Sequence, residues 1–120
     1  INPEDSHLAL LEAGCLVLAG RLEAGDARFA TLAAPPDVQD QELILRAWYH
    51  AVCGHREAFY RAFEAALAAA RSPYILIWLD QDGDLDRYRD EARFRRLVRL
   101  HRQRILGTTA LALRTATSSP

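Results

Sequence analysis

A run of evenly spaced carboxylates near residue 80 is one place where the sequence could support chemistry. The segment Asp80–Asp86, followed by Glu91, puts acidic side chains at loop positions 1, 3, 5 and 12 of a calcium-binding EF-hand. That loop needs glycine at position 6 for its sharp turn, whereas Gly83 stands at position 4 and Leu85 at position 6. The sequence therefore predicts a solvated acidic turn and no calcium site. We expect its partners to be nearby arginines: Arg87, Arg89 and Arg93.

A second candidate is the group of His50, Cys53 and His55 around Gly54. His50 and Cys53 are three residues apart and can share a helix face, and imidazole nitrogen and thiolate sulfur are ligands that Zn²⁺ prefers. A fourth ligand is lacking, because Glu57 lies beyond the turn expected at Gly54. Cys53 as a nucleophile likewise has no orienting acid and no oxyanion site. We therefore expect the histidines to pack or hydrogen-bond within a helical hairpin, with no metal, cofactor or catalytic residue.

The third feature is the basic C-terminal part of the chain. Residues 1–91 hold eight arginines and sixteen acids, a net charge of −8, whereas residues 92–120 hold seven arginines and no acid, a net charge of +7. Such a basic helix face attracts phosphates, anionic lipid or an acidic partner, although a merely solvated face is the alternative. The residues expected to contact an anionic partner are Arg95, Arg96, Arg99 and Arg102.

These candidates must be positioned by helices. The chain has 120 residues, half of them hydrophobic, which is enough for one core, and its alanine-rich runs favour helix over strand. Apolar side chains at helical spacing, such as Leu8, Leu11, Cys15 and Leu18, and helix-ending glycines define the elements. The expected helices run from Asp5 or Ser6 to Gly20, about 21–34, 38–53, 55–71 and 91–105, with a short buried helix or extended piece at 74–79.

Turn and capping residues separate these helices. Gly20 and Gly54 suit the left-handed turn at a helix end, and Gly25 weakens the second helix by about 1 kcal/mol relative to alanine. Pro35 and Pro36 should stop the second helix. Asp37 should cap the third helix, and Ser72 the segment that begins at Pro73.

The two hairpins repeat with a fixed offset of 34 residues. Small, glycine and aromatic positions coincide without a gap: Ala13 with Ala47, Gly20 with Gly54, Glu23 with Glu57, Ala24 with Ala58, Phe29 with Phe63 and Ala34 with Ala68. This period and the residues Ala47, Gly54, Phe63, Ala66 and Leu67 resemble tetratricopeptide (TPR) repeats. The segment 79–98, an Asp-Leu-Asp-x-x-Arg turn and a short Arg-Phe helix, looks like the closing segment of many bacterial arrays.

The resemblance implies an all-α, TPR-like solenoid. It divides the chain into the end of a preceding repeat (1–5), repeat 1 (6–36), repeat 2 (37–71), a capping segment (72–106) and a tail (107–120), as the end of a longer array. In the capping segment Phe94, Leu97 and Val98 should be buried and the arginines beside them solvated.

The resemblance also implies function, namely recognition of a peptide or helix of a partner protein in the groove of the solenoid. It assigns the groove to Leu10, Val17, Ile44, Trp48 and Ala51, with packing between hairpins as the alternative for Trp48. We expect a non-enzymatic scaffold in a bacterial signalling, regulatory or secretion-chaperone protein. A nucleic-acid-associated regulator that uses the Arg-rich helix is the alternative.

The two cysteines, the length of the apolar runs and the number of repeats bear on the compartment and the oligomeric state. Cys15 and Cys53 fall in helices and are too few for a disulfide framework, so we expect reduced thiols in the core and a cytoplasmic protein. No apolar run reaches the ~18 residues of a membrane span. An array needs about three repeats, so Leu8, Leu10 and Leu11 should lie against a further hairpin or a second copy of the chain.

Overall fold

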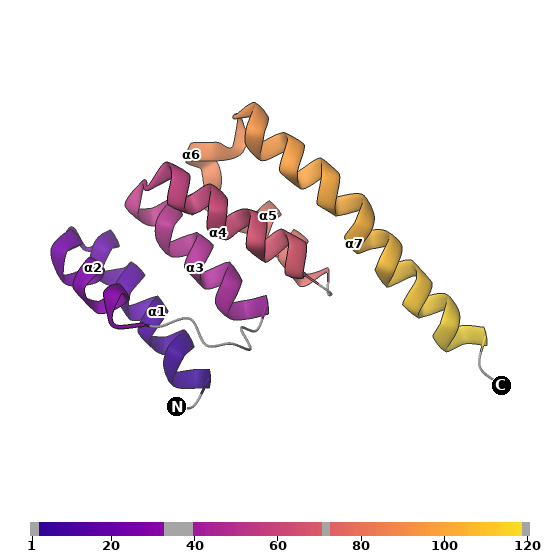
Figure 1. Ribbon diagram of the computed structural model, residues 1–120, viewed down its shortest axis with the longest axis horizontal. Coiled ribbons are helices and arrows are strands. Elements are labelled where there is room, and N and C mark those ends of the chain that lie inside the picture. The colour runs from indigo at the N-terminus through magenta and orange to yellow at the C-terminus, as the bar shows by residue number, and fades with distance from the viewer. Residues whose placement is uncertain (1–2, 33–39, 71–72, 119–120) are drawn as a thin grey trace. The chain divides into compact units, whose positions relative to one another are not determined.

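The computed structural model describes residues 3–32, 40–70 and 73–118, and all regular structure in these ranges is helical (Figure 1). The predicted all-α fold class is therefore confirmed. The elements are α1 (Pro3–Leu18), α2 (Leu22–Ala30), α3 (Asp40–Cys53), α4 (Arg56–Ala69), α5 (Tyr74–Gln81), the 3₁₀ turn η1 (Gly83–Leu85), α6 (Asp86–Arg89) and α7 (Ala92–Ser118).

Several predicted boundaries shift. α1 already contains Asp5 and Ser6, which are therefore not its caps, because the helix begins at Pro3, whose fixed φ suits a first turn. α2 ends at Ala30 and not near residue 34, and the Thr31 hydroxyl donates to the Arg28 carbonyl at 2.7 Å there. The predicted stop at Pro35 and Pro36 and the predicted caps Asp37 and Ser72 lie outside the described residues.

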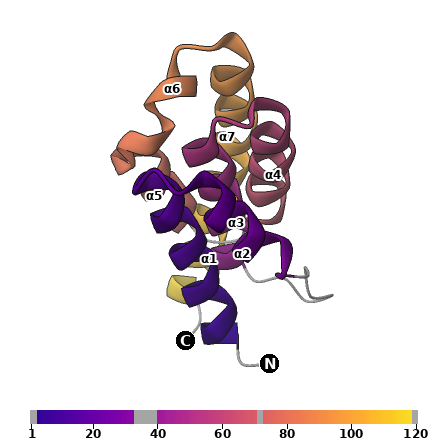
Figure 2. The same ribbon diagram turned by 90° about the vertical axis from the view of Figure 1, so that its left-hand side faces the viewer.

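The contacts divide the chain into two compact units, residues 1–66 and 67–120. In the first unit, α1 lies beside α2 and also packs against α3, as both views show (Figure 1, Figure 2). The unit is thus built from packed helix pairs, an arrangement compatible with a helical repeat fold. Its largest fully buried side chains are Leu10, Tyr49, Phe59, Tyr60 and Phe63.

The same helix-ending turn occurs at Gly20 and Gly54, 34 residues apart. Both glycines have positive φ, 84° and 75°, where a side chain would be strained. In each turn the glycine N–H donates to the carbonyl three residues back and the next N–H to the carbonyl five residues back, which is the Schellman motif. The prediction of a left-handed glycine turn at both positions is confirmed.

Two other glycines let the helices of the first unit approach closely. A Cβ added at Gly25 would lie 2.5 Å from Val17 Cγ2 and 2.8 Å from the Ala13 carbonyl oxygen. A Cβ added at Gly14 would lie 2.1 Å from the indole of Trp48. From the sequence, Gly25 is predicted only to lower the helix stability of α2. The structure corrects this interpretation, because Gly25 is the point at which α2 packs against α1.

The second unit is organised by two arginines. Arg89 donates to the carbonyls of Leu79 and Asp82 and pairs with Asp86 at 2.6 Å, and so ties the end of α5 to η1 and α6. Arg104 of α7 donates to the Leu67 carbonyl at 2.6 Å and the Ala70 carbonyl at 3.4 Å. A positive charge at these last carbonyls stabilises the C-terminal end of α4.

Two sequence-level alternatives in this unit are decided by the structure. The apolar segment 74–79 is a helix, α5, with Ile75, Leu76 and Leu79 buried. The last helix, α7, does not end near Ile105 but continues through Gly107 to Ser118, so the predicted tail is helical as far as Ser118 (Figure 1). The orientation of α7 agrees with expectation, since Phe94 is buried whereas Arg95 and Arg96 are exposed. Leu97 and Val98, also predicted to be buried, are only half-buried.

A pair of glycine substitutions tests the close approach of α1 and α2. Helix propensity alone predicts that Gly25→Ala stabilises α2, whereas the contact with the Ala13 backbone predicts destabilisation by about 1–3 kcal/mol. We expect the contact to dominate, because a helix backbone cannot rotate away as a side chain can. Gly107→Ala is the matched control, since nothing lies within 4 Å of its added Cβ, and it should stabilise by about 0.5–1 kcal/mol. Urea unfolding measures both. Stabilisation by Gly25→Ala would contradict the contact argument.

A second comparison tests the burial of α7. Phe94 is 6% exposed, so Phe94→Ala should lower the free energy of unfolding by about 3–5 kcal/mol. The matched control is Arg96→Ala, an exposed position on the same turn, which should change stability by less than about 0.5 kcal/mol. Thermal melts compare the two. A Phe94 variant that melts like wild type beside a collapsed Arg96 variant would reverse the orientation of the helix.

Candidate functional site

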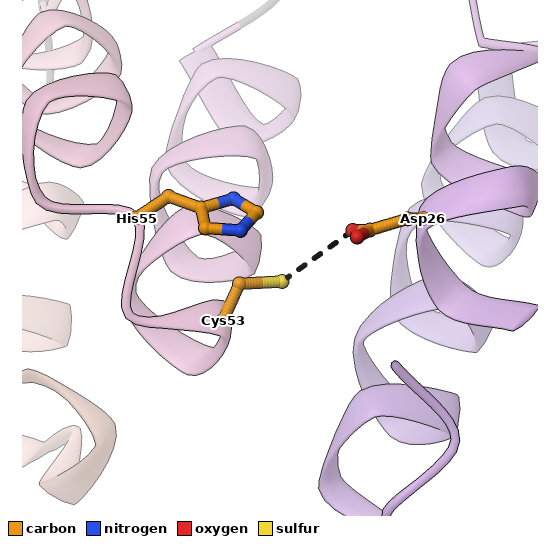
Figure 3. A group of neighbouring side chains, drawn as sticks. All are labelled: Asp26, Cys53 and His55. Carbon is orange, nitrogen blue, oxygen red and sulfur yellow. Dashed lines mark hydrogen bonds between the residues drawn. The ribbon is translucent and has the colours of Figure 1, made fainter. Parts of the chain in front are cut away.

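Three potential metal ligands from two separate segments meet in the first unit. One ligand atom each from Asp26 of α2, Cys53 at the end of α3 and His55 in the α3–α4 turn lie within 4.8 Å of one another (Figure 3). Asp26 and Cys53 are half-buried and His55 is exposed. The Cys53 thiol donates to Asp26 Oδ1 with a sulfur–oxygen distance of 3.9 Å. The sequence groups Cys53 and His55 with His50, whereas the structure joins them with Asp26, which lies 27 residues before Cys53. The group still has three ligands, and His50 is not one of them.

The turn at Gly54 brings His55 back toward Cys53. Gly54 donates its N–H to the Ala51 carbonyl at 3.2 Å, and His55 donates its N–H to the His50 carbonyl at 3.1 Å. These bonds fix the backbone on both sides of the glycine, so the two side chains that flank it project from a rigid helix end. The Schellman motif that ends α3 therefore also places two of the three ligands.

Tyr49 fixes the third member of the cluster. Its hydroxyl donates a hydrogen bond to Asp26 Oδ1, and its ring stacks on Phe29 of α2 with centroids 4.2 Å apart and planes 3° from parallel. Burial, and then the hydrogen bond to Asp26, raise the pKa of Tyr49 well above its usual range. The phenol therefore stays neutral and remains a donor that orients the carboxylate.

His50 is half-buried and lies beside the cluster. Its ring meets Phe29 edge-on at 5.1 Å and lies 6.1 Å from the His55 ring. Its Nδ1 is buried without a hydrogen-bond partner among the described residues. Burial lowers the pKa of His50 to about 4, helped by the charges of His55, Arg46 and Arg61 and opposed by Asp26. His50 is therefore neutral at pH 7.

The residues predicted to line a partner groove lie mostly inside the first unit. Leu10, Ile44, Trp48 and Ala51 are buried, and Val17 is half-buried. The Trp48 ring lies directly over Gly14 of α1, which is the packing alternative that the sequence left open. These side chains thus stabilise the contact of α1 with α3 and present little surface. Binding of a partner through them stays a prediction.

An apolar surface lies instead on the opposite side of α1, which we call the outer α1 stripe: Leu8, Leu11, Cys15 and Leu18. The three leucines are 64%, 41% and 58% exposed. Cys15 is also exposed, so the prediction of a core thiol is wrong there, because Cys15 lies on the side of α1 that faces away from α2 and α3. Between Leu8 and Ala19 the only charged residue is Glu12. A helix that is apolar all round is normally covered on all sides. The prediction that Leu8 and Leu11 are available for a contact is consistent with this exposure, whereas Leu10 is fully buried.

The acidic turn does not gather its carboxylates around one point. Asp82 accepts from the Trp78 indole N–H at 2.7 Å and from the Asp84 N–H at 2.9 Å, Asp86 pairs with Arg89, and Asp80 pairs with Arg102 at 3.3 Å. The expected pairing with Arg89 is confirmed, and the pairing with Arg102 was not foreseen. Asp82 and Asp86 are thus engaged within the turn itself, as in an ordinary capping turn, whereas Asp80 pairs with an arginine of α7.

Ion pairs also change the predicted anionic-partner face of α7. Arg95 pairs with Asp90 at 3.2 Å, and Arg102 pairs with Asp80. Arg96 and Arg99 are exposed, and no acid in the described part of the chain pairs with either. Two of the four arginines are thus already neutralised, and two remain available to an external anion.

Comparisons with known proteins do not assign the chain. No protein-family model, no curated protein and no solved structure matches it. Within the described residues, no helix combines the length and apolar character needed to cross a membrane.

The burial of neutral His50 makes stability depend on pH. Its pKa is about 4 in the folded chain and about 6.5 in the unfolded chain, so only the unfolded state takes up a proton between these values. The stability due to neutral His50 should be complete above about pH 6.5. It should fall by up to about 3 kcal/mol as the pH decreases to 4.

Urea unfolding from pH 7 to 4 tests this expectation. His50→Gln should be flatter over that range than wild type, because it removes the group that titrates. His7→Gln, at a partly buried histidine on α1, is the control and should keep the wild-type slope. Equal slopes for wild type and His50→Gln would contradict the assignment.

Proposed function

We propose that the chain is a TPR-like interaction module that binds an amphipathic helix of a partner protein on the outer α1 stripe. The observation that carries this proposal is the exposure of Leu8, Leu11 and Leu18 on a helix with a single charge between Leu8 and Ala19. Leaving such side chains in water forgoes up to about 1.5–3 kcal/mol each. An exposed apolar patch of this kind is typical of an interaction site.

The spacing of the stripe supports a helical occupant. Its members follow one another at intervals of three, four and three residues, the spacing of the a and d positions in a helix-packing heptad. A partner helix with the same spacing can insert its side chains between them, whereas an extended peptide has a period of two. The buried opposite face, with Ala9, Leu10 and Ala13, holds α1 in place as a rigid platform.

The size of the stripe bears on its occupant and affinity. If two copies met through α1 alone, each would contribute three partly exposed leucines and a cysteine. The area that these four side chains can bury is well below the ~800 Å² per partner of a stable interface. A separate helix can carry larger side chains and reach beyond the stripe. We therefore favour a partner helix over self-association and expect micromolar affinity.

The second candidate function is recognition of an anionic partner, such as nucleic acid, by α7. The exposed arginines Arg96 and Arg99, without acidic partners in the described part of the chain, favour it. Their binding would be dominated by phosphate attraction and would weaken steeply with salt. Salt dependence therefore separates the two functions.

Selection from a phage-displayed library of helical peptides tests the proposed function. Enriched peptides should carry apolar residues at heptad spacing. Leu11→Glu and Leu18→Glu should each weaken their binding at least about tenfold, because a charge would be buried in an apolar seam. Leu106→Glu, at an exposed leucine of α7, is the matched control and should bind like wild type.

The salt response and the oligomeric state decide between the alternatives. Raising NaCl from about 0.05 to 0.5 M should change peptide binding less than about threefold if the contact is apolar. Peptides that bind Leu11→Glu and Leu18→Glu as tightly as the control Leu106→Glu would show that the outer α1 stripe is not the binding site. A steep salt dependence that disappears in Arg96→Ala/Arg99→Ala would favour an anionic partner. Light scattering that shows a dimer lost in Leu11→Glu would make a second copy the occupant.

A further inference from the structure

We infer that Asp26, Cys53 and His55 form a binding site for a zinc-like divalent metal ion. The site lies between α2 and the α3–α4 turn, within the first unit (Figure 3). It is independent of the outer α1 stripe, because none of its three residues belongs to α1.

The donor set selects the class of metal. One carboxylate oxygen, one sulfur and one imidazole nitrogen suit Zn²⁺, which accepts all three ligand types. Ca²⁺ and Mg²⁺ prefer sites made of oxygen alone. Zinc with three protein ligands commonly takes water or another small ligand at the fourth position.

The distances are close to those of a bound site. Ligand atoms on one tetrahedral Zn²⁺ lie about 3.3–3.6 Å apart, given bonds of about 2.0–2.3 Å. Here Cys53 Sγ lies 3.9 Å from Asp26 Oδ1, and all three ligand atoms lie within 4.8 Å of one another. The ligand atoms therefore need to approach one another by at most about 1 Å, and His55 is the exposed ligand of the three. Its exposure also provides the route by which an ion reaches the site.

The surroundings provide the second layer that metal ligands require. Tyr49 donates to Asp26 and orients the carboxylate, as outer hydrogen bonds do in metal sites. Next to the cluster, buried His50 Nδ1 has no hydrogen-bond partner among the described residues. A buried nitrogen left unsatisfied by protein atoms is a place where a further ligand or an ordered water is expected.

Charge is balanced when the metal binds. The Cys53 thiol gives up its proton to solvent and binds as a thiolate, so one M²⁺ meets a thiolate, the Asp26 carboxylate and neutral His55. The resulting site has no net charge, which suits a half-buried position. Because a proton is released, binding should strengthen as the pH rises.

Titration of the intact chain with Co²⁺, which absorbs in the visible where Zn²⁺ does not, tests the inference. Wild type should develop visible bands and a sulfur-to-cobalt charge-transfer band in the near ultraviolet, both removed by excess Zn²⁺. Cys53→Ser should abolish the charge-transfer band. Cys15→Ser, at the exposed cysteine of α1, is the matched control and should keep it.

Two further measurements keep the test decisive if Cys53→Ser unfolds. His55→Gln alters an exposed side chain, so it should stay folded by circular dichroism yet bind about 10–100-fold more weakly. Zn²⁺ at about 100-fold above its Kd should raise the Tm of wild type and Cys15→Ser by about 5–15 °C. It should leave the Tm of Cys53→Ser unchanged.

Three results would overturn the inference. Wild type that gives no charge-transfer band does not use Cys53 as a ligand. A band lost in Cys15→Ser and retained in Cys53→Ser places the metal elsewhere. Equal Zn²⁺ affinity in wild type and His55→Gln excludes His55 and with it the three-residue site.

Discussion

The close contact of α1 with its two neighbours is the constraint on which the first unit depends. At Gly25 the α2 backbone approaches the Ala13 carbonyl, and at Gly14 the Trp48 ring rests on α1 where a Cβ would stand. Close packing of this kind has few solutions, because any side chain at either glycine would force the helices apart. These two contacts set how closely α2 and α3 approach α1.

The packing of α2 and α3 determines which face of α1 is buried and which is exposed. Seating α2 and α3 on Ala9, Ala13 and Gly14 turns the opposite leucines to solvent, so the packed face and the outer α1 stripe are two results of one arrangement. Seating α2 on α1 also carries Asp26 to the end of α3. There the ring of Phe29 on α2 stacks on the ring of Tyr49 on α3, and Asp26 lies close to Cys53 and His55.

The sequence predicts most of the local structure and less of the packing. The sequence predicts the helices and their glycine ends because these depend on residues close together in the chain. It also predicts the 34-residue offset, because a fixed period can be found by comparing the chain with itself. The sequence does not predict which face of α1 is buried, because the helix is apolar on every side and periodicity cannot distinguish one side from another. The role of Gly25 was missed for a related reason: propensity describes a helix by itself, whereas the close approach involves Val17 and Ala13 of another helix.

The candidate sites show the same division. Cys53 and His55 could be grouped from their spacing, but Asp26 is 27 residues away and only the seating of α2 brings it near. Periodicity alone could not find it. Likewise, the basic character of α7 was evident from composition. The pairing of Arg102 with Asp80 depends on how α5 and α7 meet, which no local pattern encodes.

The two Schellman turns share one backbone geometry but differ in the side chains that flank the glycine. Both reverse the backbone through the same glycine geometry, but Ala19 and Arg21 flank the first turn, whereas Cys53 and His55 flank the second. The hydrogen bonds of the turn use only backbone atoms, so they place no demand on those two side chains. The two residues that flank the glycine can therefore be replaced while the helix ending stays intact. The turn is a fixed backbone frame, and the side chains on either side of it are set independently of that frame.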